Sequence, residues 1–504
     1  MMEFRAFCVV SVLMVFVAGV GAQSSTEELL NRCQAELDAA HYKNAVDSCQ
    51  QVLKQAPARP EAVYGLVRAL LSDRRSRDAY TAAAEGLESN PRSSSIQAAA
   101  GIVAFRKGLL TEAEKYFRAA IQLNPNDPAA LSGLAEVYDI ISRFKTAQDI
   151  RLRAYQALPT DPELMLAHAR TLKREERIRV LEQVLALRDP ATDEARRLRA
   201  TIATLRALGD RTPGRLVSSY APVQMKLVAI QNGLNHKRGD GLRVQFNGKE
   251  TVTLLLDTGA SGISVSPVTI QKAGLQLLGN ESSDVRGIGN KEISSYNYLA
   301  SKIKIGPVEF EDYPVTAFDT AKDSDVDGII GADVFRDFIV TMDFPYQQIA
   351  LTTRPNYQPG SQELSDAAAA PPAGFYRVYR FGDHIVIPTF VNGDKPSLFL
   401  MDTGASSSFI DTTLARETTE VSRDPRSTVR GVQGKVSEVS RARYVNLRFA
   451  NLQENNSQLL AIDMDKMSDD MGVAIQGVLG MPILSKLRLT IDYVEGTVRF
   501  ETPR

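Results

Sequence analysis

The sequence predicts a multidomain protein in which an all-α solenoid of helical repeats is followed by an all-β part built of two similar lobes. In the first half, alanine and proline recur every 34 residues, and in the second half one ordered set of short motifs occurs twice. The chain has 504 residues, enough for several domains. Hydrophobic residues make up 44% and charged residues 24%, as in folded globular proteins, and the net charge of −1 argues against nucleic acid as a partner.

The N-terminus carries an apolar run over residues 6–20, followed by the small residues Gly21 and Ala22. The run has the length of a signal-peptide core and is short for a membrane span. We therefore expect residues 1–22 to be a cleaved signal peptide, with an uncleaved anchor as the alternative. The protein would then be exported, periplasmic or secreted, with no stable membrane span after cleavage.

The first half shows a repeat whose period is carried by alanines and prolines. The recurring positions are Ala45, Ala79, Ala113 and Ala147, and Pro57, Pro91, Pro125 and Pro159. Small residues let two antiparallel helices approach, and a proline ends the second helix of each pair. The pattern resembles the tetratricopeptide repeat, whose signature positions in the third unit are Gly101, Ala113, Phe117, Ala120 and Pro125. We expect helical repeats over residues 26–208, with a degenerate fifth pair and a capping helix at the end.

The resemblance implies a scaffold with a concave groove that recruits a protein partner or the substrate; a purely structural spacer is the alternative. In the repeat frame, Cys33 lies on the first helix of unit one and Cys49 on its partner helix. Packing of the pair would bring the two within bridging distance, so an exported chain could form a disulfide here. Two buried free thiols are the alternative.

The second half repeats one β unit. An Asn-Gly turn between apolar strands predicts a hairpin, and it occurs at Asn247 and again at Asn392. Ten residues after each asparagine stands an aspartate, Asp257 or Asp402, which opens the pentapeptide Asp-Thr-Gly-Ala-Ser.

Three further motifs follow each aspartate in the same order: a glycine cluster, a hydrophobic-hydrophobic-Gly segment and an Asp-aromatic pair. One β fold is therefore written twice. We place the first lobe at residues 215–354, a linker rich in Ala and Pro at 355–374, and the second lobe at 375–504.

These motifs resemble the retropepsin-like and pepsin-like aspartic proteases over roughly residues 242–503. The resemblance implies that Asp257 and Asp402 form a catalytic pair that shares one proton, activates water and protonates the leaving nitrogen. A pair of ordinary turn aspartates is the alternative. The length of the linker permits the two lobes to pair within one chain, which we expect, although each lobe could instead pair with a lobe of another chain.

The same resemblance assigns supporting roles. Thr258 and Thr403 would bond across the lobe interface, and Gly259 and Gly404 would let the backbone lie close to the carboxylates. Flaps over an extended substrate would come from two glycine clusters. Their residues are Gly287, Ile288, Gly289, Gly431, Val432 and Gly434. Neither cluster contains the tyrosine of a pepsin-like flap, so the arrangement is closer to a retropepsin dimer fused into one chain. The Asp-aromatic aspartates, Asp343 and Asp492, are expected to end strands rather than to catalyse.

The sequence thus predicts an aspartic endopeptidase that hydrolyses peptide or protein substrates without a cofactor or metal. It contains no His-Glu-x-x-His, no Cys-x-x-Cys and no histidine pair at metal-ligand spacing. The alternative is a catalytically inactive scaffold that binds peptides or proteins.

Overall fold

The structure is a computed structural model. It describes residues 26–231, 237–284, 294–318, 326–355, 357–360, 366–367, 370–424, 427–431, 434–436 and 438–503. The predicted signal peptide, residues 1–22, lies outside this part of the chain. Two compact units are present: one runs to Val137 and resumes over Asp149–Ala195, and the other comprises Tyr138–Gln148 and Arg196–Arg504.

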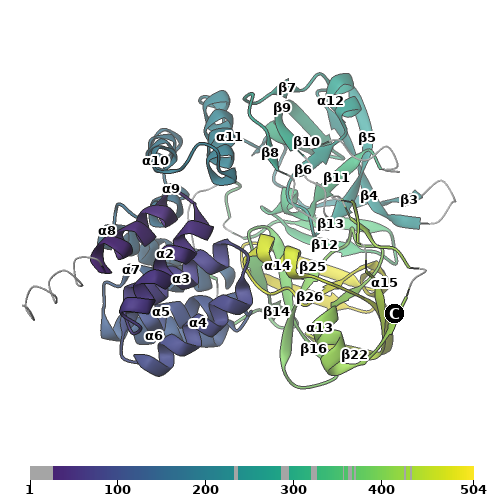
Figure 1. The fold of residues 1–504 in the computed structure, drawn as a ribbon. Coiled ribbons are helices and arrows are strands. Elements are labelled where there is room, and N and C mark those ends of the chain that lie inside the picture. Colours follow the sequence, from purple (N-terminus) through teal and green to yellow (C-terminus); the bar gives the residue numbers. More distant parts are fainter. Residues whose placement is uncertain are drawn as a thin grey trace, which may run out of the picture. The chain divides into compact units, whose positions relative to one another are not determined.

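Helices make up the first part of the chain (Figure 1). After a helix over residues 26–38, they are α2(Tyr42–Gln55), α3(Pro60–Ser72), α4(Ser76–Ser89), α5(Ser94–Arg106), α6(Leu110–Leu123), α7(Pro128–Ile140), α8(Phe144–Ala157), α9(Pro162–Ala169), α10(Arg174–Leu187) and α11(Asp193–Leu208). Across the described residues, no helix is both long and apolar enough to cross a membrane.

The recurring small residues hold the helices together. The repeated alanines are fully buried, with no exposed surface: Ala45, Ala79, Ala113 and Ala147. A Cβ atom added at Gly101 would lie 2.5 Å from the ring of Phe117, and one added at Gly133 would lie 2.2 Å from it. The repeated alanines are therefore core positions, and the two glycines stand where one helix packs too closely on the next for a larger side chain.

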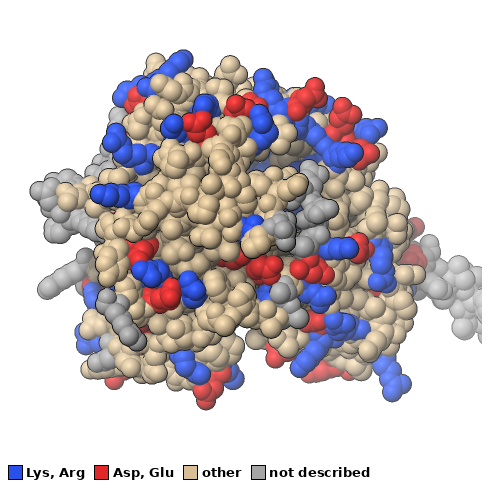
Figure 2. Space-filling model, turned by 180° about the vertical axis from the view of Figure 1, so that it is seen from behind, with Lys and Arg blue, Asp and Glu red and all other residues tan. Residues whose placement is uncertain are grey.

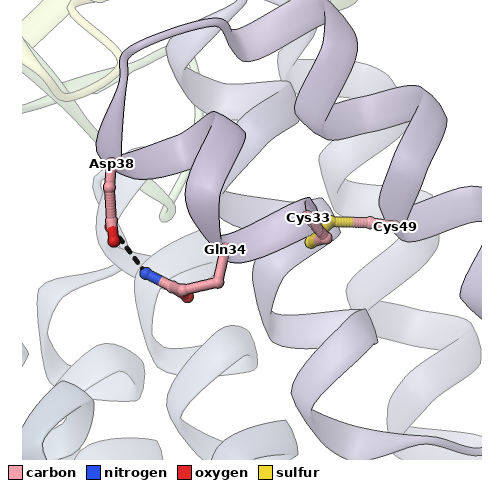
Figure 3. The surroundings of a disulfide bond; sticks show 4 residues. All are labelled: Cys33, Gln34, Asp38 and Cys49. Atoms are coloured by element: carbon pink, nitrogen blue, oxygen red, sulfur yellow. Dashed lines mark hydrogen bonds between the residues drawn. A yellow bond between two sulfur atoms is a disulfide. The ribbon is translucent and has the colours of Figure 1, made fainter. Parts of the chain in front are cut away.

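A disulfide staples the first helical pair. Cys33 and Cys49 are bonded, with their Cα atoms 5.2 Å apart, as Figure 3 shows. Both are buried, and Gly65 of α3 packs on them: a Cβ atom there would lie 3.0 Å and 3.2 Å from the two sulfurs. The bond therefore lies inside the core of the first two repeats.

Strands make up most of the rest. In the first half of the β part they are β1(Arg215–Leu216), β2(Val223–Lys226), β3(Val228–Gln231), β4(Lys237–Phe246), β5(Glu250–Asp257), β6(Ile263–Val265), β7(Gln276–Leu277), β8(Ser283–Asp284), β9(Ser294–Ile305), β10(Val308–Phe318), β11(Gly328–Gly331), β12(Ile339–Asp343) and β13(Gln348–Thr352). The helix α12(Pro267–Ala273) and the 3-10 helix η1(Ala332–Phe335) interrupt them.

The second half repeats this layout. Its strands are β14(Tyr376–Arg377), β15(Tyr379–Phe381), β16(His384–Val391), β17(Pro396–Met401), β18(Phe409–Asp411), β19(Glu420–Arg423), β20(Arg430–Gly431), β21(Gly434–Lys435), β22(Ser440–Phe449), β23(Leu452–Ile462), β24(Gly477–Leu479), β25(Arg488–Asp492) and β26(Thr497–Glu501). The helices among them are α13(Thr412–Thr418), α14(Asp465–Met471) and α15(Met481–Leu484).

Each lobe has its own sheet. In the first lobe, ten strands include the order β1-β10-β6-β11-β5-β4-β9-β7, and in the second lobe eight strands follow the order β15-β16-β17-β24-β18-β23-β22-β19. The central strands correspond: β5 runs parallel to β11 as β17 does to β24. The fold class predicted from the sequence, a helical solenoid followed by two β lobes, is confirmed.

The two hairpin asparagines adopt the same local structure in both lobes. Asn247 and Asn392 both adopt positive φ, 51° and 47°. Each side-chain oxygen accepts a backbone N–H from a neighbouring strand, that of Lys302 at 3.1 Å and that of Asn446 at 2.8 Å. Asparagine tolerates this backbone conformation and ties the turn to the sheet.

A six-stranded sheet joins the lobes within one chain, in the order β14-β26-β25-β12-β13-β2. At its centre β12 and β25 run antiparallel, and the hydroxyl oxygens of Thr341 and Thr490 lie 3.1 Å apart. Asp343 and Asp492 end these two strands. Each pairs with an arginine, Asp343 with Arg488 at 2.6 Å and Asp492 with Arg354 at 2.8 Å, so both have structural contacts, as expected.

The surface carries mixed charge. On the face shown in Figure 2, lysines and arginines lie intermingled with aspartates and glutamates. This mixture agrees with the net charge of −1.

Candidate active site

Asp257 and Asp402 stand where two buried central strands end. Asp257 is the last residue of β5, and Asp402 directly follows β17. The preceding apolar residues are buried, so the chain emerges from the core at the aspartate. The parallel neighbour strand ends at the same level in both lobes, with Gly331 opposite Asp257 and Leu479 opposite Met401.

Two threonines lock the loops together across the lobes. The Thr258 N–H donates to Thr403 Oγ1 at 3.0 Å, and the Thr403 N–H donates to Thr258 Oγ1 at 3.1 Å. Each hydroxyl in turn donates across the interface: Thr258 to the carbonyl of Met401 at 2.7 Å, and Thr403 to that of Leu256 at 2.8 Å. Both threonines are 1% exposed, so these four bonds form away from water and fix the loops face to face.

Each glycine of the duplicated motif packs against the carboxylate of the opposite lobe. A Cβ atom at Gly259 would lie 2.7 Å from Asp402 Cγ, and one at Gly404 would lie 2.4 Å from Asp257 Cγ. Each glycine N–H also donates to the aspartate of its own lobe, at 2.7 Å for Gly259 and 2.9 Å for Gly404. The two carboxylates are therefore held together, and they share a side-chain hydrogen bond.

Both carboxyls of the pair bind a proton more tightly than an ordinary aspartate does. Burial raises the pKa of both carboxyls. For Asp402 the neighbouring charge of Asp257 adds to burial, and its pKa stands well above the usual range. For Asp257 the hydrogen bonds from Asp402 and from the N–H groups of Gly259 and Gly404 offset part of the effect of burial on the pKa. The proton is a property of the coupled pair rather than of either aspartate alone.

A third carboxyl supports the first aspartate loop and was not singled out from the sequence. Asp333 of η1 accepts the N–H of Gly262 with both oxygens, at 3.0 Å and 3.1 Å. Burial raises the pKa of Asp333 to about 6. In both lobes the glycine that ends the hydrophobic segment also donates its N–H to the aspartate loop, Gly331 to the carbonyl of Gly262 at 2.7 Å and Gly480 to Ser408 Oγ at 3.0 Å. The only sequence signal for Asp333 is its place two residues after the Ile-Ile-Gly segment.

The predicted flaps are described in part. Gly431 and Gly434 face each other in the two-stranded ribbon of β20 and β21, which is the form expected of a flap hairpin. Val432 and the first-lobe cluster, Gly287 to Gly289, lie outside the described residues. Among those that are described, no three His, Cys, Asp or Glu side chains gather in a way that could hold a metal ion.

Comparison with known families finds two kinds of domain in the chain. A model described as aspartyl protease matches residues 242–334 and 387–483, one segment in each lobe. A tetratricopeptide repeat model matches residues 64–128 and 98–162. No curated protein matches the chain.

Several solved structures resemble part of the chain. They include PilF of Pseudomonas aeruginosa, with 16% identity over 37% of this chain and 86% of that chain and a TM-score of 0.25. TTC0263, a tetratricopeptide repeat protein of Thermus thermophilus, is 20% identical over 36% of this chain and 98% of its own, with a TM-score of 0.29. The MamA protein is 17% identical over 33% and 92%, with a TM-score of 0.21. Likenesses this low carry no functional argument.

Proposed function

We propose that this chain, which joins tetratricopeptide repeats to an aspartyl protease domain, is an aspartic endopeptidase whose catalytic pair is Asp257 and Asp402. One observation carries the proposal: two carboxyls from separate lobes share a hydrogen bond and are held in place by the interlocked threonines Thr258 and Thr403. Two aspartates whose only role is in a turn would not be expected to form a rigid, partly buried pair.

The arrangement suits amide hydrolysis. An ionised carboxylate can take a proton from a water molecule, while the protonated partner donates its proton to the substrate. Two carboxyls that bind one proton between them supply both functions at once. Gly259 and Gly404 then serve to keep the carboxylates close together, and the ribbon of Gly431 and Gly434 would cover an extended peptide.

The test replaces each carboxyl by an amide of the same size. Asp257→Asn and Asp402→Asn should each abolish cleavage of a peptide library assayed between about pH 3 and 8, because the pair then loses either its base or its shared proton. Asp394→Asn is the matched control, since this second-lobe side chain is fully exposed (101%) and its variant should cleave like the wild type. Cleavage at the wild-type rate by either pair variant would refute the assignment.

The repeats support a second part of the proposal, namely that the helical array recruits the substrate or a protein partner. If the wild type binds library peptides but cleaves none at any pH, the inactive scaffold replaces the endopeptidase. We also propose that the protein is exported, on the basis of the apolar run over residues 6–20. Intact mass of protein from its native host would show a mature chain that begins after Ala22, and a full-length chain would contradict export by cleavage.

A further inference from the structure

His384 lies at the edge of the candidate site without a role in it so far. It is the first residue of β16, and this strand pairs with β17 so that Val386 stands opposite Leu400. Continuing this register by two residues places His384 level with Asp402. Its Nδ1 atom is sealed from solvent and has no hydrogen-bond partner within the described part of the chain.

An ion pair between the lobes holds the turn that carries His384. The preceding residue, Asp383, pairs with the guanidinium of Arg336, which follows η1 in the first lobe. Arg336 also lies 3.7 Å from Asp333, the carboxyl that supports the first aspartate loop. This tie fixes a second-lobe turn against the first lobe, and His384 interacts electrostatically with Asp257 there.

At the corresponding register position of the first lobe, within the residues that the structure describes, a glycine stands in place of the histidine. In the pairing of β4 with β5, Gly241 stands opposite Leu255, which places Gly239 level with Asp257. A Cβ atom at Gly239 would lie 2.5 Å from Cδ1 of Leu255, so a side chain there would require the Leu255 side chain to move. Among the described residues, the two lobes therefore differ at this register position, where the first lobe has Gly239 and the second has His384.

We propose that His384 is a positioning residue for the carboxyl pair, whose cationic imidazole favours an ionised Asp257 and so directs the shared proton to Asp402. The inference rests on the proposed function, because it concerns the protonation of the same pair. The groups that act on the imidazole are Asp383 from its own turn and Asp257 from the end of β5. Arg336 affects the imidazole indirectly, by its ion pair with Asp383, and Asp402 affects it indirectly, by its hydrogen bond with Asp257.

The sign of the effect follows from these neighbours. Burial lowers the pKa of His384, and the charges of Asp383 and Asp257 oppose that change. The imidazole is therefore a cation only on the acid side of its titration. There it stabilises the Asp257 carboxylate, so the pair takes up its second proton at lower pH than it would beside a neutral side chain. The site would keep its active, singly protonated form further into acid.

The first experiment measures the electrostatic interaction between His384 and Asp257 and does not depend on cleavage. Nitrogen-15-labelled histidine gives few signals, since the sequence has four histidines, and His384→Asn identifies the one in question. Followed by NMR across pH, the His384 imidazole should titrate at lower pH in Asp257→Asn than in the wild type, because a neutral amide no longer favours the cation. Asp394→Asn should leave it unchanged. An unaltered His384 titration in Asp257→Asn would overturn the inference.

The second experiment measures the effect of His384 on the pH dependence of cleavage. In His384→Asn and His384→Gln the acid limb of the kcat/KM profile should shift to higher pH, while the alkaline limb stays in place. A purely structural histidine would instead lower activity at every pH, and profiles that coincide with the wild type would also refute the role. The two failures remain distinct: continued cleavage by Asp257→Asn or Asp402→Asn refutes the proposed function, whereas unshifted His384 profiles refute only this inference.

Discussion

Replacing Gly404 by alanine tests the packing of the carboxyl pair with a single methyl group. The backbone of Gly404 does not lie in the left-handed region, so alanine is acceptable there and only the space beside it matters. The new Cβ would lie 2.4 Å from both Cγ and Oδ2 of Asp257, where ordinary contact begins at 3.4 Å. The Asp257 carboxylate must therefore move by about 1 Å, and a displacement of that size at a reacting group costs roughly 100-fold in rate.

The assay is kcat/KM on a library peptide that the wild type cleaves, together with the free energy of unfolding in denaturant. We expect Gly404→Ala to lose about 100-fold in kcat/KM and about 1–3 kcal/mol in stability from overpacking. Gly393→Ala is the matched control in the same lobe, because its nearest atom, the carbonyl oxygen of Val391, would lie 3.7 Å away. A Gly404→Ala enzyme as active as the control would show that the carboxylates do not need this geometry.

Three further predictions concern stability. Thr258→Val should lower the free energy of unfolding by about 1–3 kcal/mol in guanidinium titrations, because the buried Met401 carbonyl and Thr403 N–H lose their hydrogen-bond partner. A variant as stable as the wild type would contradict the role of the hydrogen bonds between Thr258 and the second lobe. Joint replacement of Cys33 and Cys49 by serine should destabilise the helical repeats by about 2–4 kcal/mol in thermal unfolding followed by circular dichroism, and reductant should lower the wild-type midpoint but not that of the double variant. The pKa of Asp333 is about 6 in the folded protein against an ordinary 3.8, so its carboxyl binds a proton more tightly in the folded state. The free energy of unfolding should therefore rise by up to ~3 kcal/mol as pH falls from about 6 to about 4. Asp333→Asn should flatten this pH dependence in denaturant titrations, and an unchanged pH dependence would refute the burial argument.

The contribution of the sequence was greatest where a signal is local or periodic. The repeated alanines could be read as helix contacts because a 34-residue period reports which side chains recur at one place in a helical pair. The same register predicts that Cys33 and Cys49 lie on facing helices, and the structure has them bonded. The Asn-Gly turns at Asn247 and Asn392 likewise need only neighbouring residues to specify a hairpin.

Residues whose importance comes from distant neighbours carry no such signal. Asp333 follows the Ile-Ile-Gly segment and His384 begins a hydrophobic strand, and neither position by itself identifies a site residue. Asp333 meets Gly262, 71 positions away, only in the folded lobe, and the turn that carries His384 is held by the ion pair between Arg336 of one lobe and Asp383 of the other. Such a contact has no period and no motif.

By itself the sequence determined the solenoid, the duplicated β lobes and the identity of Asp257 and Asp402 as the candidate catalytic residues. Only the tertiary structure decided that they meet: Thr258 and Thr403, 145 positions apart, interlock because β12 and β25 join both lobes in one sheet. The physical reason is that hydrogen-bonding patterns along a chain are short-ranged, whereas the burial that raises the pKa of a carboxyl pair is a property of the space the folded lobes enclose.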